Sequence, residues 1–171
     1  MKNKSLKRIL GTAITLLTAM MVIQGAAYAQ DSDPKTNARH DRIVGVWNIQ
    51  NTLLTCDTPA TVVGSFSALH KYELGGTGQV VPATNPAALS AHMMVWNWVQ
   101  DNDYQFAVKL FRFNTATGAA VAYTIIRANV TLNEDATEYT GSGRAETFDL
   151  NGNPLPVPPI TCPSFTGTRF Q

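Results

Sequence analysis

Charged residues are scarce in this sequence. Asp, Glu, Lys and Arg make up 15% of its 171 residues, the net charge is +1, and hydrophobic residues make up 44%. This proportion of charged to hydrophobic residues excludes intrinsic disorder, coiled coils and collagen-like repeats. The length suits one globular domain. A basic surplus is missing too, because four of the 13 Lys and Arg residues lie in the first eight positions while all 12 acidic residues lie further along. We therefore expect no nucleic-acid partner.

Common catalytic and metal-binding motifs are also missing. The sequence has no G-x-S-x-G, H-E-x-x-H or Walker pattern, and Gly75-Gly76-Thr77-Gly78 lacks the Lys that a phosphate-binding loop needs. The three histidines, His40, His70 and His92, form no pair with ligand spacing. The sequence thus predicts no metal, no cofactor and no catalytic residue. It favours a protein that is not an enzyme but leaves that question open.

The first 29 residues have the form of an export signal. Positive charges over residues 2–8 precede an apolar run over residues 9–23, and Ala27-Tyr28-Ala29 supplies the small residues that a signal peptidase recognises. The apolar run is shorter than the roughly 20 residues that span a bilayer. We expect cleavage before Gln30, a flexible tail over 30–42 and a folded domain over 43–171. The product would be secreted or periplasmic, with no membrane span.

From residue 43 onward, apolar residues alternate with polar ones, which is typical of β-strands. Turn residues divide this region into eight predicted strands: 43–54, 65–74, 79–81, 93–99, 104–113, 119–132, 138–148 and 160–170. Short turns join antiparallel neighbours, and pairing of the first strand with the last removes the free edges. The sequence therefore predicts an all-β fold, an eight-stranded antiparallel up-and-down barrel.

The two cysteines lie where this barrel would close. Cys56 ends the first predicted strand and Cys162 begins the eighth, and two cysteines of an exported protein are expected to bond. If the two cysteines face each other, Trp47 lies opposite Gln171, or beside Arg169 where a bulge shifts the pairing. We predict a disulfide that staples the closure.

Two short motifs resemble those of the lipocalins and the broader calycin barrels. They are Gly45-Val46-Trp47 in the first predicted strand and Arg169 near the end of the last. The resemblance implies that the Trp packs across the closed end of the barrel with the Arg over it, so that Gly45, Trp47 and Arg169 form a structural plug. The longer predicted loops lie at the opposite end, which we expect to be the mouth.

The interior of a small eight-stranded barrel is either filled by its own side chains or holds one small ligand. Gly141 and Gly143 share the predicted inward face of the seventh strand, which leaves space for rings or for a guest molecule. We predict binding of a small, mainly apolar molecule, with His70 as the polar anchor and the lining His70, Tyr72, Trp96, Trp98, Tyr104 and Phe106. Two alternatives remain: an interaction or inhibitor module that presents loops to a partner not identified here, and a calycin-type cyclase or isomerase.

The export signal makes a direct prediction. Because Ala27 and Ala29 occupy the small-residue positions before the expected cleavage site, the exported protein should begin at Gln30. Intact-mass measurement of protein recovered from the periplasm or medium checks this. Recovery of a membrane-bound product that keeps Met1 would contradict it.

Overall fold

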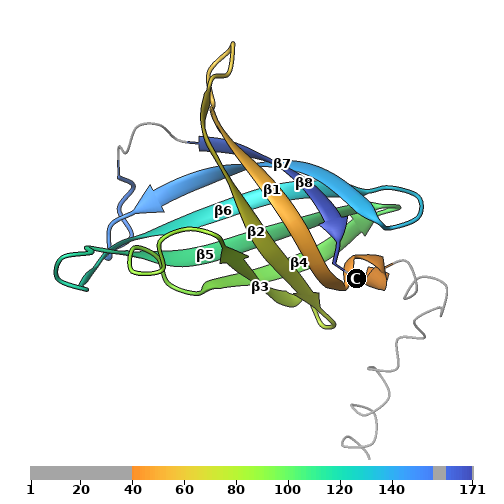
Figure 1. Cartoon of the computed structure of the whole chain (residues 1–171), viewed down its shortest axis with the longest axis horizontal. Helices are drawn as coiled ribbons and strands as arrows, with labels where there is room; N and C mark the ends of the chain where they lie inside the picture. Colours follow the sequence, from red (N-terminus) through yellow and green to blue (C-terminus); the bar gives the residue numbers. More distant parts are fainter. Residues whose placement is uncertain (1–39, 156–160, 171) are drawn as a thin grey trace, which may run out of the picture. The chain divides into compact units, whose positions relative to one another are not determined.

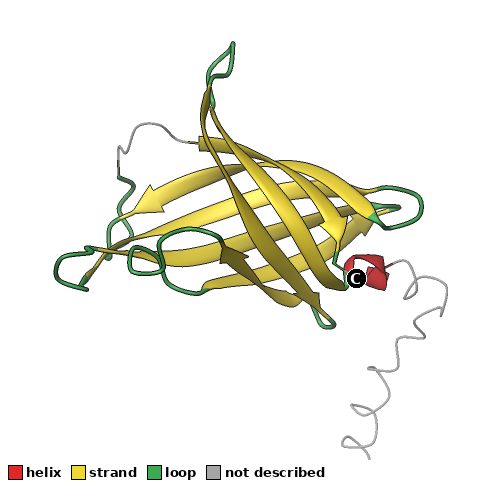
Figure 2. Ribbon diagram, viewed as in Figure 1, coloured by secondary structure: helices red, strands yellow, loops and turns green. Residues whose placement is uncertain are grey.

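The computed structural model describes residues 40–155 and 161–170. Each strand pairs with the next in antiparallel fashion and β1 pairs with β8, so the sheet closes into a barrel (Figures 1 and 2). This confirms the predicted eight-stranded up-and-down barrel. Its elements are η1 Asp41–Ile43, β1 Gly45–Thr55, β2 Val62–Glu73, β3 Thr77–Pro82, β4 His92–Gln100, β5 Asp103–Phe113, β6 Ala120–Leu132, β7 Glu138–Phe148 and β8 Thr161–Arg169.

Not every predicted segment falls within the described residues. The export signal over 1–29 and the tail over 30–39 lie outside them. Residues 40–42, which we assigned to the tail, belong to the folded unit because η1 packs there: Ile43 is fully buried, and the Arg42 Nη1 donates to Asn102 Oδ1 at 2.6 Å. Among the described residues, no helix is long and apolar enough to cross a membrane.

Alternation along each strand places one set of side chains inside the barrel. In β5, for example, Tyr104, Phe106, Val108 and Leu110 are all buried, whereas the exposed residue Gln105 lies between two of them. Burial of apolar surface is the main favourable term in folding, so this alternation fixes which face of each strand turns inward.

The β1–β2 connection is shorter than the sequence indicated. We expected a long loop over 55–64, but Leu54 pairs with Val62 and Leu53 with Gly64 across a bulge. The two strands therefore form an extended hairpin, which projects beyond the other strands in Figure 1. The mouth of the barrel is bordered on this side by a hairpin rather than by a loop.

The pairing of β1 with β8 corrects the predicted register. Trp47 lies opposite Arg169, and Leu54 lies opposite Cys162. Direct pairing of Cys56 with Cys162, and hence of Trp47 with Gln171, is therefore wrong by two residues. Cys56 follows the last residue of β1 and reaches Cys162 diagonally, with their Cα atoms 5.2 Å apart. The predicted disulfide itself is confirmed.

The closed end holds the three residues that we assigned to a plug. Trp47 is fully buried and its Nε1 donates to the carbonyl of Ile43 at 2.8 Å. The guanidinium carbon of Arg169 lies 4.4 Å from the centre of a Trp47 ring, and Nη1 donates to the carbonyl of Val44 at 2.9 Å. Gly45 has a φ of +136°, and a Cβ there would lie 2.7 Å from Arg169 Nη1. A side chain at position 45 would therefore displace the Arg.

The disulfide closes a long stretch of chain, since its cysteines are 106 residues apart. Replacing both cysteines by Ser should lower the free energy of unfolding by about 4 to 5 kcal/mol, because the unfolded chain regains the entropy of an open loop. Urea titration followed by circular dichroism measures this. Wild-type protein in reductant is the control and should match the double variant, whereas equal stability with and without reductant would contradict the prediction.

Candidate ligand site at the gap between β3 and β4

Four of the six side chains predicted to line a cavity pack at the closed end instead. Trp96 Nε1 donates to the carbonyl of Thr77 at 2.8 Å, and Trp98 Nε1 donates to that of Asp101 at 3.0 Å. The other two of this group, Tyr72 and Tyr104, are each 1% exposed. The ring of Trp96 contacts those of Tyr72 and Tyr104 edge-on or tilted, so these three form part of the core near the plug. Trp98 is half-buried and packs against His40, with ring centroids 4.3 Å apart.

The wall of the barrel separates higher up, between β3 and β4. These strands pair only from Thr77 with Val95 to Val80 with His92. Beyond that point β3 continues to Pro82 beside β2, while the segment before β4 leaves and pairs with β5, where Ser90 N–H donates to the carbonyl of Phe111 at 2.9 Å. Proline has no N–H to donate to a neighbouring strand, which suits an interruption of the sheet at this place.

A pocket of about 220 Å³ occupies this gap, and we call it the outer pocket. Its polar side chains are few, and among them only the imidazole of His92 can titrate. Residues from β3, the following loop and the start of β4 line it: Gln79, Val80, Val81, Pro82, Thr84, Pro86, Leu89, Ser90, Ala91 and His92.

A second space of about 40 Å³, the inner cavity, lies in the barrel interior. Val80, Pro82 and His92 line both spaces, so the outer pocket and the inner cavity lie on either side of these three residues. The inner cavity has room for one or two atoms beyond a single water molecule. Its lining is Asn51, Phe66, His70, Val80, Pro82, His92, Phe106, Val108, Ile126 and Phe165. Of the predicted lining, the structure thus brings His70 and Phe106 to this cavity.

The register of the strands explains why two histidines reach one cavity. His70 of β2 and His92 of β4 are both neighbours of Val80 on β3, so all three turn to the inside in one row across the sheet. We did not assign His92 to a site from the sequence. Its alternation with Met94 and Trp96, which are both buried, is the signal that could have placed it on the inward face.

Both imidazoles are neutral at physiological pH. Burial, together with the smaller effect of the neighbouring His92, lowers the pKa of His70 to about 3. Burial also lowers the pKa of His92. His70 Nδ1 lies 3.0 Å from the Tyr139 hydroxyl, and His92 Nδ1 lies 2.8 Å from the carbonyl oxygen of Ser90. No Asp, Glu, Lys or Arg lines either space. Across the described residues, no group of three or more His, Cys, Asp or Glu is placed to hold a metal ion.

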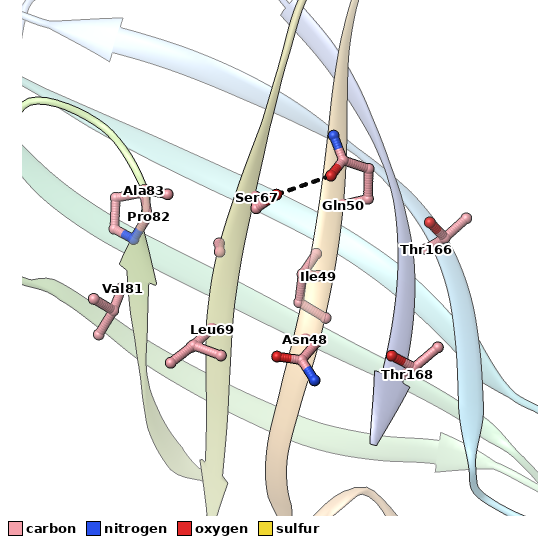
Figure 3. Close-up of a pocket in the computed structure, with 11 residues that line it drawn as sticks. Asn48, Ile49, Gln50, Ser67, Leu69, Val81, Pro82, Ala83, Thr166 and Thr168 are labelled. Atoms are coloured by element: carbon pink, nitrogen blue, oxygen red, sulfur yellow. Dashed lines mark hydrogen bonds between the residues drawn. The ribbon is translucent and has the colours of Figure 1, made fainter. Parts of the chain in front are cut away.

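A larger groove of about 530 Å³ lies on the outer face of β8, β1, β2 and β3 (Figure 3). Its lining residues carry no charge, and the Ser67 hydroxyl donates to Gln50 Oε1 at 3.0 Å across two strands. Amide and hydroxyl groups share the groove with small apolar side chains: Asn48, Ile49, Gln50, Ser67, Ala68, Leu69, Val81, Pro82, Ala83, Thr166 and Thr168. It is open to solvent along its length and holds no titratable side chain.

Comparisons with known proteins assign no family. No family model matches the chain, and no curated protein sequence matches it. The assignment of function therefore depends on the geometry described above.

The buried histidines predict how stability depends on pH. Below pH 6.5 the unfolded chain protonates His70 and His92, whereas folded His70 stays neutral until about pH 3. The free energy of unfolding should therefore fall as the pH is lowered below 6.5, and His70 should contribute about 1.4 kcal/mol of this fall per pH unit. Urea titrations at pH 7.5, 6.5, 5.5 and 4.5 measure the slope, and this range avoids most carboxylate titration.

The variant His70→Gln serves as the comparison for that slope. It removes one of the two buried imidazoles, so its stability should depend less steeply on pH than that of the wild type. Equal slopes in the two proteins would show that His70 does not titrate differently in the folded and unfolded states.

Proposed function

We propose that this chain is an exported, lipocalin-like barrel of the calycin type that binds a small, mainly apolar molecule through the gap in its wall. The apolar part occupies the outer pocket, and the polar end reaches the inner cavity beside His92 and His70. The observation that carries the proposal is that two adjoining spaces lead from the surface to a pair of buried histidines. Ligand sites commonly combine apolar walls with a few placed polar groups in this way.

Two further observations support the family likeness and the compartment. The stacking of Arg169 on Trp47 at the closed end is the arrangement that the resemblance to lipocalins implies. The bonded pair Cys56 and Cys162 suits an oxidising compartment, as does the export signal in the sequence. The entrance in this proposal is lateral, between β3 and the loop before β4, rather than through the mouth.

An enzyme of the cyclase or isomerase type is less well supported. A general acid or base works best with a pKa near the working pH, and burial holds the pKa of His70 at about 3. The lining of the inner cavity includes no carboxylate, thiol or amine that could act with it. Its groups are suited to holding a ligand more than to moving a proton.

A protein-interaction module is the second candidate, and the groove of Figure 3 favours it. The groove is larger than the outer pocket, and it lies beside the projecting β1–β2 hairpin. The groove combines uncharged amide and hydroxyl groups with the exposed apolar side chains of Leu69 and Val81. A protein partner can cover a surface of this kind. This candidate becomes the better one if the gap binds no small molecule.

The proposed function predicts binding of an apolar probe at the gap. N-phenyl-1-naphthylamine, which is neutral and fluoresces in apolar surroundings, should bind saturably to the wild type. Ala91→Trp should lower the affinity at least tenfold, because the new ring fills the outer pocket that Ala91 lines. Fluorescence titration, excited above the absorption of tryptophan, measures both affinities.

Ala87→Trp is the matched control. Ala87 is exposed, belongs to the same loop and lines neither space, so this variant should bind the probe as the wild type does. Absence of saturable binding to the wild type, or equal losses in both variants, would remove the gap as the binding site.

A further inference from the structure

We infer that the polar end of the ligand is a small, uncharged hydrogen-bond donor, such as a primary hydroxyl, held by a hydrogen bond to Nε2 of His92 or to Oδ1 of Asn51. Carboxylate, phosphate and ammonium ends are rejected. This inference rests on the proposed function, since it concerns what the gap selects once an apolar ligand enters it.

The hydrogen bond of His92 fixes which of its nitrogens can accept. A backbone carbonyl only accepts hydrogen bonds, so the Nδ1 atom, 2.8 Å from the carbonyl oxygen of Ser90, must carry the proton. Burial lowers the pKa of His92, so the ring carries only that one proton. Nε2 is therefore an acceptor, and no other hydrogen bond of this ring is formed within the described residues.

Asn51 also lines the inner cavity and carries a second acceptor. Its Nδ2 donates to the carbonyl of Phe66 at 3.3 Å, which orients the amide and leaves Oδ1 as its only acceptor, beside one further N–H. Asn51 is 4% exposed, so little of its side chain contacts bulk solvent. A hydroxyl that enters the cavity can donate to one of these acceptors.

Charged ends are disfavoured because nothing in the lining compensates them. The inner cavity has no Lys or Arg to pair with a carboxylate or phosphate, and no Asp or Glu to pair with an ammonium group. Moving an unpaired ion from water into such surroundings costs many times more than losing one hydrogen bond. Protonation of His70 could supply a cation, but its burial opposes this.

The size of the inner cavity limits the polar end further. About 40 Å³ accommodates a hydroxyl and the carbon that bears it, but not a sugar ring or a branched head group. The chain that follows must be apolar and narrow, because it passes Val80, Pro82 and His92 to reach the outer pocket.

A matched series of eight-carbon probes tests the selection. Octan-1-ol, octanoate, octylammonium and 1-chlorooctane share one chain and differ at its end, and each displaces N-phenyl-1-naphthylamine in competition at pH 7.5. We expect octan-1-ol to bind at least tenfold more tightly than either ion and about tenfold more tightly than 1-chlorooctane. A tenfold difference corresponds to about 1.4 kcal/mol, the usual scale of one buried hydrogen bond.

Variants assign the selection to the two acceptors. His92→Phe and Asn51→Leu should each weaken octan-1-ol binding severalfold while leaving 1-chlorooctane within twofold. His92→Gln keeps an acceptor and should retain most of the preference. Thr124→Val is the matched control, since Thr124 is a buried polar residue that lines neither space, and it should leave the series unchanged. Circular dichroism verifies that each variant is folded.

The outcomes separate this inference from the proposed function. If octanoate binds as tightly as octan-1-ol, or if 1-chlorooctane does, the gap binds apolar molecules but the assigned selection is wrong. The wild-type series alone decides this, even where a variant does not fold. If none of the four probes displaces N-phenyl-1-naphthylamine and that probe itself does not bind, the proposed function fails and the inference fails with it.

Discussion

Closure of the sheet between β1 and β8 is the interaction on which the rest of this structure depends. It pairs strands from the two ends of the folded unit and so gives every strand two neighbours. The disulfide holds one end of this seam, and the stacking of Arg169 on Trp47 holds the other. Because the seam is fixed at both ends, the sheet can interrupt its pairing elsewhere, between β3 and β4, without opening the barrel.

That interruption divides the molecule into two regions with different physical character. Near the plug, large buried rings fill the interior. Near the gap lies a small cavity whose lining includes three of the four buried polar residues in the described chain, Asn51, His70 and His92. Each of these three residues makes a hydrogen bond, as buried polar groups usually do, and their concentration beside the gap supports the proposed binding role.

The sequence predicted the strands and their closure well, because alternation and turn residues are local signals that burial enforces. It failed where depth along the barrel mattered. Trp96 and Trp98 alternate with the residues that face inward, but this alternation does not show how far along the barrel, from the plug, a residue lies. The turn that follows Trp98 lies at the same end as Trp47, and this turn could have placed both Trp rings near the plug.

The predicted register of β1 against β8 was wrong by two residues because Cys56 lies past the end of β1, where a disulfide can join diagonal neighbours. His92 was missed as a site residue because its role depends on the interrupted pairing of β3 with β4, which no local pattern reveals.

The proposed lateral access has a consequence for the loops at the mouth of the barrel. The turn over 114–119 and the described part of the β7–β8 connection over 149–155 line neither the outer pocket nor the inner cavity. Surface loops tolerate insertions when few contacts depend on them. These two connections can therefore be lengthened, replaced or fused to another domain while the gap keeps its shape. If the proposed function holds, the barrel has one face for recognition of a small molecule and another for attachment to a larger partner, so evolution or design can alter each without altering the other.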